Sequence, residues 1–219
     1  MKTKTTYLLI LAAGLLAAFV LWTWAVTAVD VRPIGPQASQ IGFAALNAWV
    51  HSRIGVHLSL YTVTDWLGLV PVATAMGFAL LGLCQWIRRG SPFRVDCDIL
   101  ALGVFYIAVI SAYLLFEALA INCRPILIDG RLEASYPSST TLLVLCVMPT
   151  AVMQLHARIR CRPLRRTVVA VIVEFTAFTV IGRLISGVHW ITDIIGGALL
   201  SAGLVLFYAA VCSMLDAEK

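Results

Sequence analysis

The stretch ILALGVFYIAVISAYLLF, residues 99–116, decides the fold because it contains no charged side chain. A helix needs about 20 apolar residues to cross a bilayer, where every backbone hydrogen bond must be made within the segment. Five more segments of this kind lie on either side of it. The sequence therefore predicts an all-α fold, a polytopic membrane protein whose six-transmembrane-helix bundle forms a single integral membrane domain over residues 1–219. The predicted spans are 7–29, 66–87, 99–116, 138–156, 167–184 and 192–215.

The composition excludes several other classes of protein. Of the 219 residues, 61% are hydrophobic and 12% are charged, whereas about a quarter of the residues in an ordinary soluble domain are charged. A water-soluble single core, a disordered chain and a fibrous protein are therefore excluded. The net charge of +5 does not indicate nucleic-acid binding, because the basic residues lie between the apolar segments. The six cysteines include no CxxC pair, so the sequence predicts neither a zinc site nor a thioredoxin-like redox site.

The basic residues predict the orientation of the spans. Cytoplasmic loops carry an excess of Lys and Arg. Eleven basic residues fall on one side of the membrane and five on the other, so we expect a multi-pass protein of the cytoplasmic (inner) membrane with both termini inside. Outer loops are then expected at 30–65 and 117–137, and the short connection 183–193 also faces out. The crowded side holds Lys2, Lys4, Arg88, Arg89, Arg94, Arg158, Arg160, Arg162, Arg165, Arg166 and Lys219.

Two features near the N-terminus leave alternatives open. The first apolar run resembles a signal peptide, but it exceeds 20 residues, while the usual hydrophobic region of a signal peptide has about 7–15. An uncleaved anchor is therefore favoured. The segment Gln37–Gly55 alternates apolar and polar residues loosely, so it is either an interfacial helix on the outer leaflet or a loop.

The strongest candidate site is GRLISGVHWITD, residues 182–193. If His189 begins the last helix, Asp193 lies one turn further on the same face. A carboxylate there fixes the tautomer of the imidazole and leaves its other nitrogen as a nucleophile or base. Arg183 adds a planar donor fork suited to phosphate. A capping histidine with a helix-terminal ion pair is the plainer alternative, and the cost of burying three ionisable groups weighs against it.

A second cluster comprises Arg124-Pro125 and the segment YPSSTT, residues 136–141. Ser138, Ser139 and Thr140 can cap a helix and offer donors to an anion at its positive end. Taken alone, a plain N-cap after a proline turn is the simpler interpretation. The predicted topology places both clusters on the outer face, where two arginines, a His–Asp pair and a helix N-terminus describe a phosphate pocket containing a nucleophile.

These residues resemble motifs of the type 2 phosphatidic acid phosphatase and vanadium haloperoxidase superfamily, in its membrane lipid phosphatase branch. The resemblance covers roughly residues 98–215. Arg183, His189 and Asp193 match the third motif at full spacing, with Gly182 in place of serine. The other two motifs are degenerate. Arg124-Pro125 matches the end of the first, with Glu117 at the position of its lysine, and Pro137-Ser138 begins the second, with Ser139 for glycine and Thr140 for histidine.

The resemblance implies roles for these residues. His189 would attack phosphorus and form a phosphohistidine, Asp193 would orient it, and Arg124 and Arg183 would hold the phosphoryl oxygens. Ser138 would add a hydrogen bond, and no metal or other cofactor is implied. Ser139 and Thr140 are further candidate phosphate-binding residues. Arg131 either pairs with Glu117, reaches the phosphate or is a solvated loop arginine.

The missing histidine at Thr140 bears on the substrate. Without a proton donor an alkoxide is hard to expel, since its conjugate acid resembles water with a pKa of about 15.7. A phosphate monoester leaves more readily because its second pKa is about 6. His51 or His57 could replace the acid, although a lone histidine of this kind is more often an interfacial residue. A lipid diphosphate is therefore preferred to a monoester as the substrate, with a polyprenyl diphosphate first.

Other functions stay open. Phosphatidate, diacylglycerol diphosphate and phosphatidylglycerophosphate are alternative substrates. A catalytically degenerate lipid-binding member of the family and a lipid phosphotransferase are alternatives of another kind, and Glu117 and Thr140 are the residues that favour a degenerate member.

Overall fold

The computed structural model of the chain describes residues 2–217. Lys219, one of the basic residues expected on the cytoplasmic side, lies outside the described residues. Nearly every long segment is helical, and the extended pairings among residues 2–217 are isolated bridges rather than a sheet. The helices are α1 (Lys2–Ala28), α2 (Ala44–Ile54), α3 (Leu58–Leu67), α4 (Leu69–Arg89), α5 (Cys97–Leu119), α6 (Ser139–Arg158), α7 (Arg162–Ile185) and α8 (Ile191–Ala217), with short 3₁₀ turns η1 (Pro36–Ala38) and η2 (Pro92–Arg94).

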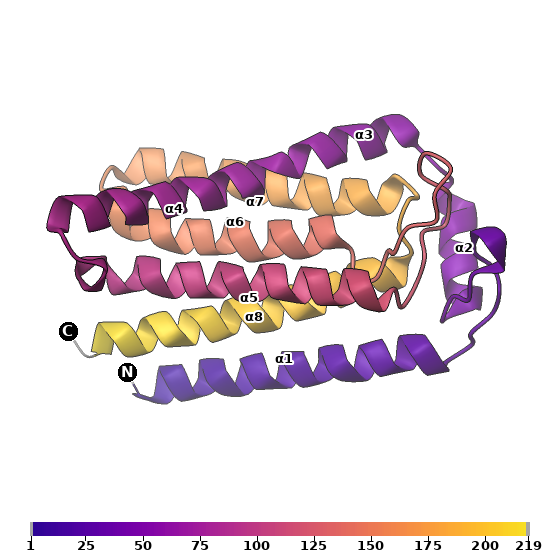
Figure 1. Ribbon diagram of the computed structural model, residues 1–219, viewed down its shortest axis with the longest axis horizontal. Helices are drawn as coiled ribbons and strands as arrows, with labels where there is room; N and C mark the ends of the chain where they lie inside the picture. The colour runs from indigo at the N-terminus through magenta and orange to yellow at the C-terminus, as the bar shows by residue number, and fades with distance from the viewer. Residues whose placement is uncertain (1, 218–219) are drawn as a thin grey trace.

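The predicted all-α bundle with six membrane spans is confirmed (Figure 1). The helices long and apolar enough to cross a membrane are Thr3–Ala28, Leu58–Arg89, Cys97–Leu119, Ser139–Arg158, Arg162–Ile185 and Ile191–Leu215.

The second span differs from the sequence prediction. It was expected over 66–87, after an outer loop at 30–65, but helix continues back to Leu58 through α3. The apolar pattern breaks at Asp65, whose carboxylate lies 3.4 Å from the guanidinium of Arg183 on α7. The charge that ended the predicted span is therefore neutralised by a neighbouring helix. The range 30–65 also contains α2, so the segment Gln37–Gly55 is helical over 44–54 and irregular before it.

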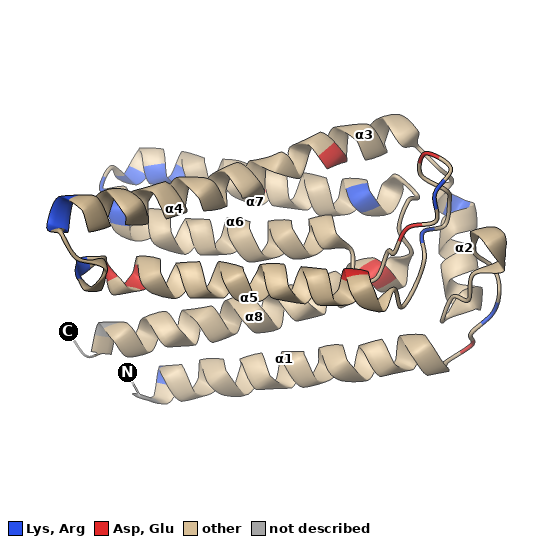
Figure 2. Ribbon diagram, in the orientation of Figure 1, with Lys and Arg blue, Asp and Glu red and all other residues tan. Residues whose placement is uncertain are grey.

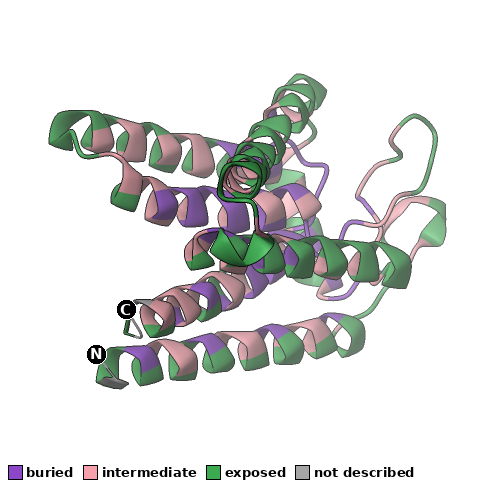
Figure 3. Cartoon of the chain, turned by 60° about the vertical axis from the view of Figure 1, so that its left-hand side comes forward, coloured by how far each residue is buried: buried purple, intermediate pink, exposed green. Residues whose placement is uncertain are grey.

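Helices α6 and α8 form the centre of the bundle. Half of the α6 span is buried and 44% of the α8 span, against 11% of the span made by α3 and α4. Helix α1 packs along α8, where Gly203 lets Leu16 approach closely, and the hydroxyl groups of Thr5 and Ser213 share a hydrogen bond of 2.9 Å. Figure 3 shows buried residues where helices face one another and exposed residues on the outward faces.

The outward faces are apolar. Large hydrophobic side chains are exposed on α1, α5 and α7, for example Leu21, Val104, Ile107 and Val171. Soluble monomers rarely expose so many large apolar side chains along whole helix faces. A multi-pass membrane protein explains these surfaces, since lipid rather than water would cover them.

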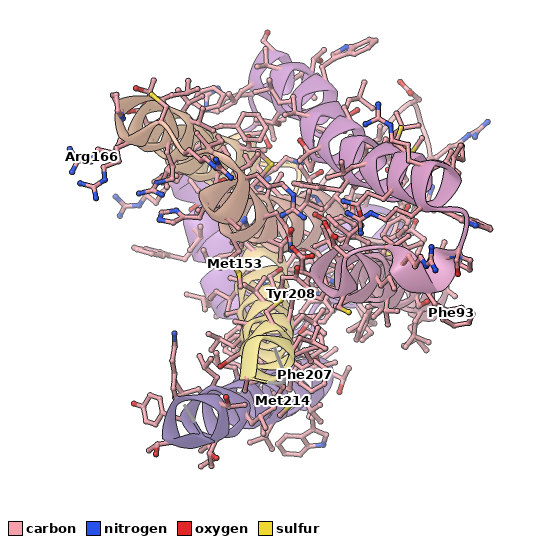
Figure 4. All side chains as sticks on the ribbon, turned by 90° about the vertical axis from the view of Figure 1, so that its left-hand side faces the viewer. Phe93, Met153, Arg166, Phe207, Tyr208 and Met214 are labelled. Carbon is pink, nitrogen blue, oxygen red and sulfur yellow. The ribbon has the colours of Figure 1, made fainter. Side chains whose placement is uncertain are left out.

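The two ends of the bundle differ in charge. We call the end that contains the start of α1 and the end of α8 the basic end, because the arginines of the α4–α5 and α6–α7 connections gather there (Figure 2). Figure 4 looks at this end, where Arg166 projects away from the helices. Helix α2 crosses the opposite end at a steep angle to the spans, beside the loop that joins α5 to α6 (Figure 1). We call this opposite end the site end.

Candidate active site

His189 and Asp193 meet at the site end, in the turn between α7 and the start of α8. The Nδ1 atom of His189 lies 3.6 Å from Oδ2 of Asp193, and the two side chains are almost completely buried. The backbone N–H of Trp190 donates to Oδ2 of Asp193 at 3.0 Å, and the amide of Asn122 donates to Oδ1 at 3.3 Å. The carboxylate is therefore held from two sides while it faces the imidazole.

A tight turn places the histidine. Gly187 has φ 70°, and a Cβ there would lie 2.0 Å from the carbonyl oxygen of Gly55, so only glycine fits between α7 and the end of α2. The Gly187 carbonyl lies 3.1 Å from Nε2 of His51. The backbone of the turn is thus fixed by contacts with the segment that precedes α3.

His189 is held in its neutral form. Burial, together with the positive charges of Arg124 and Arg183, lowers the pKa of its imidazole from 6.5 to about 4, against the opposing effect of Asp193. At neutral pH the ring therefore carries one proton and one free lone pair. That is the state in which an imidazole acts as a nucleophile.

Arg183 is buried near the end of α7, with its side chain 1% exposed. Its Nη2 atom lies 3.4 Å from Oδ1 of Asp65, and Nη1 donates to the hydroxyl of Thr64 at 3.5 Å. Its guanidinium carbon stands 4.9 Å from the ring centroid of Tyr61. All three partners belong to α3, so one short helix surrounds this arginine.

Arg124 enters the site from the loop between α5 and α6. Its Nε atom lies 2.9 Å from Oε2 of Glu133, and its side chain is 10% exposed. A backbone hydrogen bond of 3.0 Å from Arg124 N–H to the Glu133 carbonyl joins the two arms of the loop. The guanidinium carbon of Arg124 is 5.8 Å from the centroid of the same Tyr61 ring. The structure therefore brings the two predicted arginines to one place.

Several buried nitrogen atoms in this cluster have no hydrogen-bond partner among the described residues. They include Nη1 of Arg124, Nε of Arg183 and Nε2 of His189. An unsatisfied buried donor costs about 1–3 kcal/mol, and more when the group is charged. Two guanidinium groups and an imidazole, left with free nitrogens beside one another, suit an oxyanion such as a phosphoryl group.

The start of α6 also lies at the site. The Ser138 hydroxyl oxygen accepts from the N–H and the hydroxyl of Thr141, at 3.4 and 3.0 Å. The Ser138 N–H donates to the Asp193 carbonyl at 3.1 Å. The side chain of Ser138 thus acts as a helix cap, and its backbone joins the starts of α6 and α8. Ser139 lines a narrow crevice with His189 and Glu117, while Thr140 is nearly buried on the same turn.

Arg131 is not brought to the other candidates. It is exposed in the turn 128–131, where its backbone pairs with Ile128. Among the described residues it makes no ion pair with Glu117. This placement matches a solvated loop arginine, one of the three roles considered from the sequence.

The structure adds residues that the sequence did not reveal. Tyr61, Thr64 and Asp65 on α3 surround Arg183, Glu133 pairs with Arg124, and Asn122 holds Asp193. The α3 residues had one signal, since a threonine and an aspartate at i+3 and i+4 from Tyr61 share a helix face. Asn122 and Glu133 had none, because their partners lie far away in the sequence.

A large apolar groove leads to the site. It has a volume of about 980 Å³ and lies between α4, α5 and α6. At the basic end it is lined by Trp86 and Val95, and at the site end by Asp65, Ser139 and Thr140. The groove therefore runs along the bundle from one end of the spans to the polar residues beside the arginines.

The cysteines and acidic residues offer no metal site within the part of the chain that the structure describes. No group of three or more His, Cys, Asp or Glu side chains is arranged to hold an ion there. The cysteines are free thiols spread over several elements.

Fold and site together define a six-span membrane protein in which two buried arginines lie close to a buried His–Asp pair at one end of the bundle. The model of the PAP2 superfamily matches residues 72–215, and the chain belongs to that superfamily. The resemblance drawn from the motifs is thereby confirmed. No curated protein matches the chain.

One solved structure similar to this chain is described as the first transmembrane PAP2-type phosphatidylglycerolphosphate phosphatase from Bacillus subtilis. The TM-score is 0.60 with 18% sequence identity, over 94% of this chain and 96% of that chain. At this identity the likeness concerns the fold. The chain has the fold of a PAP2-type membrane lipid phosphatase.

Proposed function

We propose that this protein hydrolyses a lipid phosphate or diphosphate through a phosphohistidine on His189. The observation that carries the proposal is the set of unpaired buried nitrogens on Arg124, Arg183 and His189. A structural cluster would satisfy such donors internally. A phosphoryl group bound between them would accept from both arginines and present its phosphorus to the free imidazole nitrogen.

The reaction would proceed in two steps. Nε2 of His189 attacks phosphorus, the phosphorus–oxygen bond to the leaving group breaks, and Nδ1–H is stabilised by Asp193. Arg124 and Arg183 stabilise the negative charge on the phosphoryl oxygens. Water then attacks the phosphohistidine, which releases orthophosphate and regenerates the neutral imidazole. Thr140 stands where the family has a histidine, and its hydroxyl group is too weak an acid to protonate the leaving group. The leaving oxygen therefore takes any proton it needs from water.

A diphosphate suits this site better than a monoester. Without a general acid, a leaving phosphate monoester has the advantage over an alkoxide because its second pKa is about 6. The apolar groove of about 980 Å³ offers room for a lipid chain beside Thr140. A polyprenyl diphosphate is therefore our first substrate. The alternatives are phosphatidate, diacylglycerol diphosphate and phosphatidylglycerophosphate, the lipid after which the similar Bacillus subtilis phosphatase is named.

The proposed location is the cytoplasmic membrane with the basic end inside. The arginines of the α4–α5 and α6–α7 connections support this orientation by the positive-inside rule. The pocket would then open on the extracytoplasmic face, where the hydrolysed lipid diphosphate would be exposed.

A degenerate lipid binder is the second candidate, and a specific observation favours it. Asp65 and Glu133 already neutralise the two arginines, and Glu117 lines the crevice beside His189. If these carboxylates keep the arginines from stabilising the additional charge of the transition state, a bound phosphate would be held without being cleaved. A lipid phosphotransferase would use the same intermediate and pass the phosphoryl group to an alcohol instead of water.

Orthophosphate release by the purified protein in detergent tests the proposal. A polyprenyl diphosphate, phosphatidylglycerophosphate and phosphatidate are offered side by side, with and without a chelator. We expect release from the diphosphate, unaffected by the chelator and lost in His189→Ala. Retention of lipid without release identifies the binder, and release that needs an added alcohol identifies the transferase. Unchanged turnover in His189→Ala would remove the nucleophile assignment.

A further inference from the structure

Helix α3 lies outside the residues that the family model matches, 72–215, yet it supplies the three side chains that contact the Arg183 guanidinium. The contact between α3 and α7 is close. A Cβ at Gly182 would lie 2.8 Å from Cγ2 of Thr64, so a serine at this position would clash with α3. The glycine that replaces the motif serine at position 182 therefore makes room for α3.

Tyr61 occupies a particular place in this contact. The guanidinium carbons of Arg183 and Arg124 lie 4.9 and 5.8 Å from the centroid of its ring. The two arginines come from different parts of the fold, the end of α7 and the loop before α6. One aromatic ring is therefore the shared neighbour of both positive groups.

Two buried positive charges repel each other, so other contacts must offset the repulsion if the two guanidinium groups are to lie close together. An aromatic ring attracts a guanidinium through its quadrupole, and the attraction grows when the pair is removed from water. The carboxylates of Asp65 and Glu133 each bind one arginine. Tyr61 contacts both guanidinium groups, so its ring can hold one of them in position relative to the other.

The relative position of the arginines is decisive in this chain. The first-motif lysine is replaced by Glu117, and the described chain has no lysine near the pocket, since Lys2 and Lys4 lie at the start of α1, at the basic end. Arg124 and Arg183 therefore provide the positive charge of the pocket between them. A phosphoryl group can bind both only if their free nitrogens face a common point.

We propose that Tyr61 is a positioning residue whose ring holds Arg124 and Arg183 in the arrangement that binds the phosphoryl group. The proposal rests on the function proposed above, because it assumes that the two arginines bind phosphate. The hydroxyl group of Tyr61 has no part in it, since both contacts are made with the ring.

The test compares Tyr61→Leu, which removes the ring, with Tyr61→Phe, which keeps it. The control is Trp66→Leu, a change of an exposed aromatic residue on the same helix. Inhibition constants for inorganic phosphate and orthovanadate are measured together with kcat and KM. Loss of two cation–π contacts is expected to weaken phosphate and orthovanadate binding about tenfold. KM should rise by a similar factor and kcat should fall less, while Tyr61→Phe and Trp66→Leu stay within about twofold.

Two results would overturn the proposal. Binding of both anions by Tyr61→Leu within about twofold of the wild-type value would show that the ring holds nothing. An equal loss in Tyr61→Phe would assign the effect to the hydroxyl. If Tyr61→Leu does not elute as a folded, monodisperse protein, Tyr61→Met is used with the same criteria, because its side chain fills a similar volume.

Stabilisation against heat by inorganic phosphate and orthovanadate separates this proposal from the proposed function. If the wild type releases no orthophosphate from any lipid but is stabilised by these anions, the hydrolase proposal fails. The role of Tyr61 is then tested by the increase in Tm that the anions cause in the wild type and in the Tyr61 variants. If neither anion binds the wild type, both proposals fail together.

Discussion

Each end of the bundle contains a cluster of charged and polar side chains, and the two clusters differ in how their donors are used. At the basic end, Arg158 donates to Asp98 at 3.0 Å and to the carbonyl of Gln154 at 3.0 Å. Gln154 in turn donates to the hydroxyl of Tyr208, which donates to the Asp98 carbonyl at 3.3 Å. At the site end, the arginines and His189 keep buried nitrogens without partners among the described residues.

The number of unpaired donors distinguishes a cluster that stabilises the fold from one that can bind a ligand. The basic-end cluster joins α5, α6 and α8 and leaves none of its buried side-chain atoms unpaired within residues 2–217. A satisfied network of this kind stabilises the packing of helices. The site-end cluster contains buried donors without partners. Their energetic cost is recovered only if a ligand accepts hydrogen bonds from them. The following substitutions break or sharpen this contrast.

Replacement of the histidine should have the largest effect. His189→Ala removes the atom that would accept the phosphoryl group, so orthophosphate release should fall by about four orders of magnitude or more. The control is His57→Ala, whose ring is exposed and bonds the Ile54 carbonyl at 2.9 Å. Initial rates of orthophosphate release measure both variants. A residual rate near that of the wild type in His189→Ala would place the nucleophile elsewhere.

The two clusters can be compared directly through the same change in each. Arg183→Met should lower kcat/KM about 100- to 1,000-fold, because one donor group to the phosphoryl charge is lost. Arg158→Met should leave kcat/KM within about threefold.

The thermal stabilities should change in the opposite sense. Replacement of a whole buried ion pair by apolar side chains is often neutral or stabilising, whereas removal of one partner is destabilising, so the Tm of the double variant Asp65→Leu/Arg183→Met should equal or exceed that of the wild type. Arg158→Met should lower the Tm, by an amount that is modest because its ion pair with Asp98 is partly exposed. Equal losses of stability in the two variants would contradict the contrast between the ends.

The sequence predicted the six spans and the residues of the third motif because these signals are local. Apolar length identifies a span, and His189 and Asp193 are one helical turn apart. Helix α3 was missed for a physical reason, since a charge-free run ends at Asp65 while the pairing that neutralises it comes from Arg183, more than a hundred residues later.

The same limit applies to other residues around the pocket. Glu133 and Asn122 have no periodic or motif signal, and only the folded loop brings them to Arg124 and Asp193. Arg131 was a reasonable candidate by its place in the outer loop, but the turn at 128–131 leaves its side chain exposed. Proximity in sequence could not distinguish it from Arg124, whose side chain is buried.

Replacement of Asn122 should have a smaller effect than replacement of the residues that we propose to contact phosphate. Its amide bonds Oδ1 of Asp193, and its own oxygen accepts from Gly42 N–H at 3.4 Å. Asn122→Ala frees one oxygen of the carboxylate that orients His189, so kcat should fall about tenfold. Asn47→Ala is the matched control, because Asn47 is equally buried but bonds Gly42 and Thr192. If both variants lose the same activity, Asn122 acts through stability alone.

The smallest effect expected is that of pH on the free enzyme. Burial and the two arginines lower the pKa of His189 to about 4, so the imidazole stays neutral between pH 7 and pH 5. The fraction of reactive histidine should change less than about twofold over this range, whereas a pKa of about 6.5 would reduce it roughly 30-fold at pH 5. The histidine of the unfolded chain takes up a proton between pH 6.5 and 4 while His189 does not. The folded state therefore loses stability as the pH falls through that window.

A direct titration avoids the ionisation of the substrate, whose own phosphate group titrates near pH 6. The chain has four histidines, so NMR of protein labelled in its imidazole rings resolves few signals, and His189→Asn identifies the one of interest. We expect a midpoint near pH 4 in the apo protein. In Arg183→Met the midpoint should rise, because one of the charges that disfavour the imidazolium is gone. In Arg158→Met it should not move, since that arginine lies at the other end of the bundle. A midpoint near 6.5 in the unmodified protein would mean that water reaches the ring and that the imidazole is not held in the buried, neutral state on which the phosphohistidine mechanism depends.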